Sequence, residues 1–481
     1  MQRKFITNLA FLLFLNLLIK PFWILGIDRA VQNTVGAQAY GLYAALFNFS
    51  FLFNILLDVG ITNYNNRNIA QHNHLLNKYL SGILILRIFL SIIYFIISLT
   101  IALILGYKGA ELWILGILLL NQALISFILY LRSNLAGLHL FKTDSLISVL
   151  DRLIMIGICG ALLWGHFTTT TFKIEWFIWA QTLAYTITAI ITFLLVASKA
   201  KLSKLTWNYQ FFLIILKQSY PYAILILLMT FYNRIDSVML ERMLPDGAEQ
   251  AGIYAQAYRL LDASNMIAYL FSGLLLPMFS HMIKRKQPIQ DLVELSFSFI
   301  AIPAMIVIAF SFFFSEEVMS LLYHAHVEES AGVFRLIMSC FMAISSVYIF
   351  GTLLTANGNL KYLNIVAMIG MLTNIGLNLI LIPRMQSMGA ATSSLITQYG
   401  TAALQILLAH KVFGFKFQWP LALRYLLFLV LSFAIFGFLH TFEGQWIIHC
   451  AIGTAICFAL ALALYLIRPR ELFKLVRAGG E

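Results

Sequence analysis

Charged residues are scarce in this 481-residue chain, in which Asp, Glu, Lys and Arg together make up 11% of the sequence. Soluble globular domains carry about 25% charged residues. Hydrophobic residues instead reach 61%, and the mean hydropathy is +0.87. The shortage of charge excludes an ordinary soluble protein. It predicts a polytopic membrane protein whose length is used for membrane spans.

Cysteine is also rare, and its distribution predicts neither a disulfide framework nor a metal site. The four cysteines all lie in apolar runs, at Cys159, Cys340, Cys450 and Cys457. No cofactor is predicted. Residues 1–27 resemble a signal peptide only superficially, because they lack an A-x-A-like cleavage site. Equally apolar segments follow, so residues 1–27 are interpreted as containing the first span.

The chain contains about fourteen apolar segments of membrane-spanning character, joined by short links. If the N-terminus is placed in the cytoplasm, most Lys and Arg residues of the links fall on the cytoplasmic side, and the opposite side collects acidic residues. The positive-inside rule therefore predicts cytoplasmic termini and an even number of spans. It also accounts for the net charge of +12, so nucleic acid is excluded as a partner.

A few ionisable side chains interrupt these apolar segments. Pro221–Tyr232 would form only about 18 Å of helix, whereas the hydrocarbon core is roughly 30 Å thick. The longer stretch Pro221–Leu240 spans the bilayer, but it includes Arg234 and Asp236. Charges at this depth are costly unless they are paired or face water. The stretch therefore predicts a wet, charged space inside the membrane.

Several other polar residues are candidates for lining this space. The candidate cavity residues are Arg234, Arg259, Lys20, Arg29, Tyr258, Asn374 and Asn378. The candidates for coupling or ion pairing are Asp58, Asp236 and Asp262. Arg259 and Asp262 are three residues apart and could simply neutralise each other. Asn374 and Asn378 share a helix face, where they would serve either the substrate or interhelical packing.

Two further cations, Arg152 and Arg335, are interpreted differently. Both are placed within a turn or two of a span end, where snorkelling to the interface explains a charge. Arg87 is intermediate in depth between these two cations and the deeper ones, such as Arg234.

The sequence contains an internal repeat. Gly36–Ala44 reads GAQAYGLYA and Gly247–Ala255 reads GAEQAGIYA. Six spans separate the two copies, so both enter the membrane in the same orientation, which predicts a parallel repeat. The expected domains are a six-helix lobe over 1–200, a second six-helix lobe over 201–412, and two additional helices with a basic tail over 413–481.

Four motifs carry a resemblance to a known family. They are LLDVGITNYNNRNIA (Leu56–Ala70), RIDSVMLERML (Arg234–Leu244), GIYAQAYRLLD (Gly252–Asp262) and NIGLNLILIPRMQSMGAATSSLI (Asn374–Ile396). In this order and spacing, the chain resembles the polysaccharide transporter (O-antigen flippase) family. That family belongs to the multidrug/oligosaccharidyl-lipid/polysaccharide exporter superfamily. The resemblance covers nearly the whole chain.

The resemblance implies an all-α protein with two pseudo-symmetric six-helix lobes around a central cavity, followed by two C-terminal helices. It implies a flippase rather than an enzyme, located in the bacterial inner membrane. Its task would be to move undecaprenyl-diphosphate-linked oligosaccharide to the periplasmic leaflet by alternating access, for export of O-antigen, capsule or exopolysaccharide. The implied partners are this lipid, membrane lipid and other polysaccharide-assembly proteins.

The residues fit that substrate, because a diphosphate needs fixed cations and the planar fork of Arg binds phosphate oxygens bidentately. Two alternatives stay open. A cation-coupled drug or small-molecule exporter would favour a mainly acidic, apolar cavity. A polytopic enzyme acting on lipid-linked sugars would carry a large external loop, whereas the longest external link here is Glu316–Ser330. The sugar and the coupling ion are left undefined.

Overall fold

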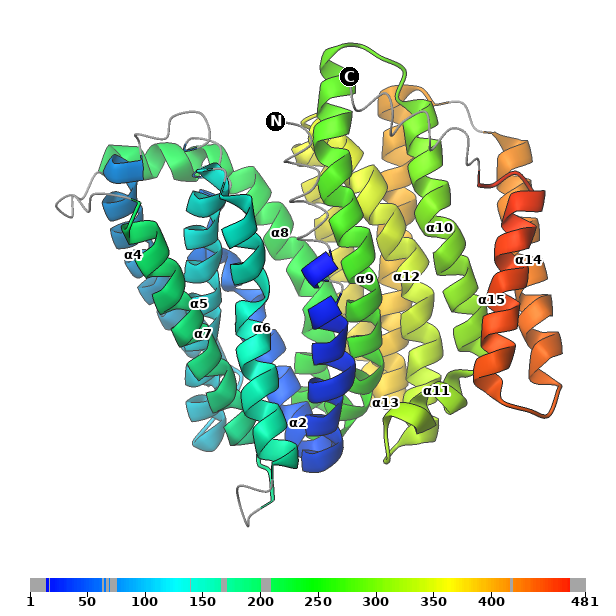
Figure 1. Cartoon of the computed structure of the whole chain (residues 1–481), viewed down its shortest axis with the longest axis horizontal. Helices are drawn as coiled ribbons and strands as arrows, with labels where there is room; N and C mark the ends of the chain where they lie inside the picture. The colour runs from blue at the N-terminus through cyan, green and yellow to red at the C-terminus, as the bar shows by residue number, and fades with distance from the viewer. Residues whose placement is uncertain are drawn as a thin grey trace. The chain divides into compact units, whose positions relative to one another are not determined.

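The structure is a computed structural model, and it is almost entirely helical. It describes residues 14–16, 18–62, 65, 69, 76–138, 140–165, 171–199, 209–415 and 418–467. No strand occurs within these residues. The chain divides into two compact units, Met1–Gly252 and Ile253–Glu481 (Figure 1).

The first unit is built from long helices separated by short links. Its elements are η1 (Trp23–Asp28), α2 (Arg29–Leu52), η2 (Asn54–Leu57), α4 (Leu76–Ile104), α5 (Ala110–Gly137), α6 (Phe141–Trp164), α7 (Ile174–Ala197), α8 (Tyr209–Met243) and the start of α9 (Gly247–Lys284). Helix α7 packs against α5 and α6, and α2 packs against α5 and α8 (Figure 1).

The second unit continues from α9. Its further elements are α10 (Gln290–Phe313), α11 (Ser315–Leu322), α12 (Val327–Ala356), α13 (Leu360–Phe413), α14 (Trp419–His440) and α15 (Trp446–Ala463). Helix α12 packs against α10 and α13, and α14 packs against α10 and α15 (Figure 1). Buried aromatic rings, among them Phe314, Phe428 and Phe436, form the core between α10, α14 and α15.

The described residues contain eleven helices that are long and apolar enough to cross a membrane. Helix α13 is interrupted at Gln386 (φ 52°, ψ −131°), and α2 is interrupted at Gly36 (φ 82°, ψ 167°). Each interruption separates two of the predicted apolar segments. Helices suit this environment because they satisfy all backbone polar groups without water. The predicted all-α polytopic fold is confirmed.

The stretch containing Arg234 forms one continuous span, as predicted. Tyr220–Met243 is long and apolar enough to cross the bilayer, and Arg234 lies inside it. At 1.5 Å per residue, Arg234 is about 21 Å from the Tyr220 end. Pro221 lies inside α8, which begins earlier, at Tyr209.

The boundary between the compact units differs from the boundary of the predicted repeat. The units meet at Gly252, whereas the repeat predicts lobes over 1–200 and 201–412. The compact units are defined by the contacts within each part of the chain, whereas the predicted lobes are defined by the similarity between two halves of the sequence. The two-lobe arrangement therefore stays a prediction.

The two copies of the repeated motif approach each other closely in the first unit. A Cβ atom added at Gly41 would lie 1.7 Å from the Ala248 carbonyl oxygen. A Cβ atom added at Gly252 would lie 2.1 Å from the Ala37 carbonyl oxygen. The Gln32 amide donates to the Gly252 carbonyl at 3.0 Å. The second glycine of each copy is thus required because the backbones are in contact.

We expect Gly41→Ala to lower the thermal stability and the membrane abundance of the protein. The added methyl group has no space, and overpacking costs about 1–3 kcal/mol. Melting temperature in detergent measures the effect. Gly116→Ala is the matched control, because a Cβ atom there meets nothing within 4 Å. Equal melting temperatures for the two variants would contradict the role assigned to Gly41.

Candidate functional site

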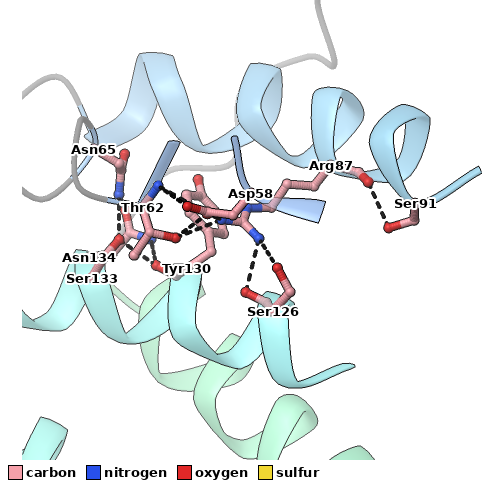
Figure 2. A network of polar contacts seen from close by, with 9 residues as sticks. All are labelled: Asp58, Thr62, Asn65, Arg87, Ser91, Ser126, Tyr130, Ser133 and Asn134. Atoms are coloured by element: carbon pink, nitrogen blue, oxygen red, sulfur yellow. Dashed lines mark hydrogen bonds and ion pairs between the residues drawn. The ribbon is translucent and has the colours of Figure 1, made fainter. Parts of the chain in front are cut away.

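A polar network surrounds Asp58, where the second predicted span breaks (Figure 2). Helix α2 ends at Leu52, and the short η2 leads into a turn at Asp58. Val59 (φ 43°) and Gly60 (φ 83°) both have positive φ. The Asp58 carboxylate accepts the backbone N–H of Thr62 at 3.1 Å. The LLDVGIT motif thus encodes a helix break that its own aspartate caps.

Arg87 of α4 binds this break. Its guanidinium pairs with Asp58 and donates to Thr62 Oγ1 at 2.7 Å (Figure 2). It also donates to both the carbonyl oxygen and the hydroxyl of Ser126, at 2.9 Å each. The guanidinium carbon lies 4.7 Å from the centre of the Tyr130 ring. Arg87 is 5% exposed and the Asp58 side chain is 26% exposed, so the ion pair is buried on its arginine side.

A second set of polar side chains lies beside the pair. Asn65 donates to Ser133 Oγ and to Asn134 Oδ1, at 3.0 Å each (Figure 2). Asn134 donates back to the Tyr130 carbonyl at 2.9 Å. These bonds attach the chain after the break to α5. Of the predicted coupling or ion-pair residues, Asp58 is therefore engaged in an extended network that joins α4, α5 and the motif.

A cationic and aromatic cluster forms around Lys20 in the first unit. We define the Lys20–Arg152 cluster as Lys20, Trp23, Asp151, Arg152 and Tyr185. The Arg152 guanidinium donates to the Tyr185 hydroxyl at 3.2 Å and lies 3.7 Å from the Asp151 carboxylate. It also lies 5.6 Å from the Trp23 ring centre. Lys20 lies within electrostatic range of both Arg152 and Asp151.

The charges of this cluster suit an anionic ligand. Lys20 and Arg152 carry +1 each and Asp151 carries −1, which leaves a net charge of +1. All three charged side chains are only partly buried. Trp23 stacks on Phe177 with ring centres 5.8 Å apart. Trp23 and Tyr185 are both buried, so these rings position the Arg152 guanidinium, and the two cations are the groups that suit a phosphate.

The interpretation of Arg152 as a residue near a span end is wrong. Helix α6 runs from Phe141 to Trp164, so Arg152 lies at its middle. The error arose because the apolar pattern does not define where this span begins. Lys20 and Trp23 in the first span could have indicated that another helix supplies a charged partner. They could not have indicated which helix does so. Arg335 does lie near a helix end, where it contacts Glu316 at 3.0 Å.

Asp28 is a buried carboxylate that sequence reasoning missed. It ends the π-helix Trp23–Asp28, and it is 4% exposed. Both of its oxygens lie 2.9 Å from the Tyr40 hydroxyl, which donates to them. Short π-helical segments frequently occur at functional sites. The signal in the sequence was an aspartate among apolar residues.

The other predicted cations of the first unit occupy different surroundings. Arg234 is partly buried, and its guanidinium lies 5.6 Å from the Phe51 ring centre. Asp236 is buried. Arg29 is partly buried, and its Nε atom has no hydrogen-bond partner among the described residues.

A compact charged cluster also joins the α4–α5 link to the end of α8. The Tyr107 hydroxyl donates to Glu241 at 3.0 Å, and Arg242 pairs with Glu241 and with Glu111. Burial, followed by the Glu241 carboxylate, raises the pKa of the Tyr107 phenol. The phenol therefore stays protonated and remains a donor. Arg242 lies 3.8 Å from the Tyr107 ring centre, which completes the contact.

In the second unit, Arg259 and Asp262 approach each other on α9, with 3.9 Å between Nη1 and Oδ2. The expected intrahelical pair is therefore present. Tyr258 stacks on Tyr254, with ring centres 5.5 Å apart. Arg259 and Arg234 belong to different units, so their expected place in one cavity stays a prediction.

The two asparagines of α13 are fully buried. Asn378 donates to Asn374 Oδ1 at 3.2 Å, so the pair shares one face of the helix as predicted. Neither side chain is exposed. In this conformation they contribute to packing, and contact with a substrate would require a rearrangement of the surrounding helices.

Solved structures with this fold are membrane transporters of the MOP superfamily. The lipid II flippase MurJ in an inward closed conformation has a TM-score of 0.63 and 17% identity, covering 94% of this chain and 97% of MurJ. An inward-facing multidrug resistance MATE family transporter has a TM-score of 0.62 and 14% identity, covering 81% and 94%. A MOP superfamily transporter from Pyrococcus furiosus has a TM-score of 0.60 and 15% identity, covering 85% and 95%.

At these identities the likeness concerns the fold. The family is shown by sequence: the profile of the polysaccharide biosynthesis protein family matches residues 8–283, which is more than half of the chain. The chain belongs to this family. Comparison with curated proteins gives no match. The resemblance inferred from the four motifs is thus confirmed, and the protein is a multi-pass membrane protein.

Proposed function

We propose that the protein is a flippase for an undecaprenyl-diphosphate-linked oligosaccharide. It moves this lipid from the cytoplasmic to the periplasmic leaflet of a bacterial inner membrane by alternating access. The flipped lipid serves the export of a surface polysaccharide such as O-antigen, capsule or exopolysaccharide. Membership of the polysaccharide biosynthesis family supports this role, as does the MurJ-like fold.

The observation that carries the proposal is the Lys20–Arg152 cluster. Charged side chains are rare in apolar spans because an unpaired cation in hydrocarbon is costly, so those that occur usually have a function. Here two cations lie beside one carboxylate, with Trp23 and Tyr185 against the guanidinium. A diphosphate brings the missing negative charge and accepts hydrogen bonds from the two cations. The polyprenyl tail needs no polar partner and stays in the lipid.

Transport by the purified full-length protein in proteoliposomes tests the proposal. The vesicles carry undecaprenyl-diphosphate oligosaccharide, and a membrane-impermeant glycan-cleaving enzyme reports how much crosses to the other leaflet. We expect crossing to exceed that in protein-free vesicles and to fall when the substrate carries a single phosphate. Accumulation of a small organic cation without movement of the lipid would favour the exporter alternative.

We expect Arg234→Ala to reduce this transport strongly and Arg234→Lys to reduce it partly. Lysine keeps the charge but loses the bidentate fork. Loss of a charge-assisted hydrogen bond corresponds to about a tenfold or larger effect. The rate of lipid crossing is measured at matched protein abundance.

Lys217→Ala is the matched control, because Lys217 is an exposed cation of the same helix outside the span. It should transport at the normal rate. Normal transport by Arg234→Ala at normal abundance would remove Arg234 from the site. Loss of the protein from the membrane would instead assign Arg234 a role in folding.

A further inference from the structure

A cavity in the second unit lies between α10, the end of α13 and the start of α14. Its volume is about 200 Å³. Phe297 forms one wall together with Tyr425 and Phe350, with ring centres 5.4 Å and 6.0 Å from its own. Tyr425 is held in place because its hydroxyl lies 2.6 Å from Ser298 Oγ. The wall is therefore an aromatic surface of defined orientation.

The lining of the cavity also includes polar and acidic side chains. The Glu294 carboxylate accepts the Gln290 amide at 2.8 Å and also the Gln418 amide. His410 faces the same space, and its Nδ1 lies 3.3 Å from the Phe415 carbonyl. Among the described residues that line the cavity, Glu294 is the only carboxylate, and no Lys or Arg is present. The lining thus joins one negative charge to aromatic rings.

The cavity lies near the start of two helices, α10 and α14, that are long and apolar enough to cross a membrane. Glu294 is one turn into α10, and the cavity also includes the residue that precedes α14. Helix α14 begins with Trp419, which is 71% exposed, and exposed tryptophans are typical of the head-group region. Beyond it, Leu423 and Leu426 are exposed on α14. A lipid can therefore extend along α14 and place its head group at the cavity.

We propose that this cavity binds the ammonium head group of a phosphatidylethanolamine-type membrane lipid. The Glu294 carboxylate accepts hydrogen bonds from the ammonium group, and the rings of Phe297 and Tyr425 offer faces for cation–π contacts. The acyl chains lie along the exposed apolar residues of α14. The site is separate from the Lys20–Arg152 cluster, which belongs to the other unit, and it does not depend on the proposed transport function.

Lipid retention by the full-length protein tests this site. The protein is placed in nanodiscs containing phosphatidylethanolamine and phosphatidylglycerol with identical acyl chains, and native mass spectrometry identifies the lipids that stay bound after release. We expect phosphatidylethanolamine to be enriched on the native protein. Glu294→Gln should reduce the enrichment about tenfold or more, which is the size expected for a lost charge-assisted hydrogen bond.

Two further variants keep the test decisive. Asp291→Asn removes an exposed carboxylate of the same helix end and should leave the enrichment unchanged. Ala422→Leu fills the cavity without altering charge and should abolish the enrichment even if Glu294→Gln fails to fold. Equal retention of both lipids by the native protein would overturn the proposal. If dissolved ethanolamine stabilised the protein in phosphatidylglycerol nanodiscs as much as phosphatidylethanolamine does, the assignment of the site to a lipid would be overturned.

Discussion

Replacing Arg152 with alanine is expected to lower lipid transport by about 30-fold or more, because a hydrogen bond to a charged group contributes about 1.5–3 kcal/mol and the proposed diphosphate would lose its bonds to the guanidinium. The substitution removes the cation that contacts Asp151, Tyr185 and Trp23 together. It leaves a carboxylate where the substrate's diphosphate would bind. Arg152→Lys should retain part of the rate, because it keeps the charge without the planar fork.

The transport rate in proteoliposomes measures this effect, with the amount of folded protein determined in parallel. Lys142→Ala is the matched control, since Lys142 is an exposed cation near the start of the same helix. It should leave the rate unchanged. If Arg152→Ala transports normally, the Lys20–Arg152 cluster does not contact the substrate. If Arg152→Lys is as inactive as alanine, the fork geometry matters more than the charge.

Arg87→Ala is expected to have the largest effect on stability. Removing one partner of a fully buried ion pair costs about 3–5 kcal/mol, because the remaining charge is left uncompensated. Asp58 is 26% exposed, so we expect a cost at or below the lower end of this range. Here the loss also frees Thr62 and Ser126 from their guanidinium partner. We expect a marked fall in melting temperature and in membrane abundance. Thermal unfolding in detergent, followed by tryptophan fluorescence, measures the change.

The double variant Asp58→Asn with Arg87→Met separates charge from packing. It should be more stable than Arg87→Ala, because neither charge is left unpaired. Arg335→Ala is the exposed-pair control: its partner Glu316 is mostly exposed, and such pairs contribute about 0–1 kcal/mol. An Arg87→Ala protein as stable as Arg335→Ala would show that the buried pair does not hold the broken span.

The sequence by itself determined the class of this protein and most of its helices. Long apolar runs must form helices in lipid, because no water is available to satisfy the backbone. The continuous span through Arg234 followed from helix length alone, and the structure confirms it. The four motifs identified the family, because their order and spacing are properties of the chain rather than of its folding. The repeated motif likewise indicated which glycines recur, although not that Gly41 and Gly252 lie against backbone.

Only the tertiary structure decided which charged groups meet. Asp58 and Arg87 are on different helices, and their pairing depends on how the break after η2 directs the chain toward α4. Arg152 and Trp23 are also far apart in the sequence, and helix packing brings them into contact. A hydropathy pattern records how apolar each segment is, but it does not specify the rotation of one helix against another. The surroundings of Asp28, Arg152 and Glu294 could therefore be read only from the packed helices.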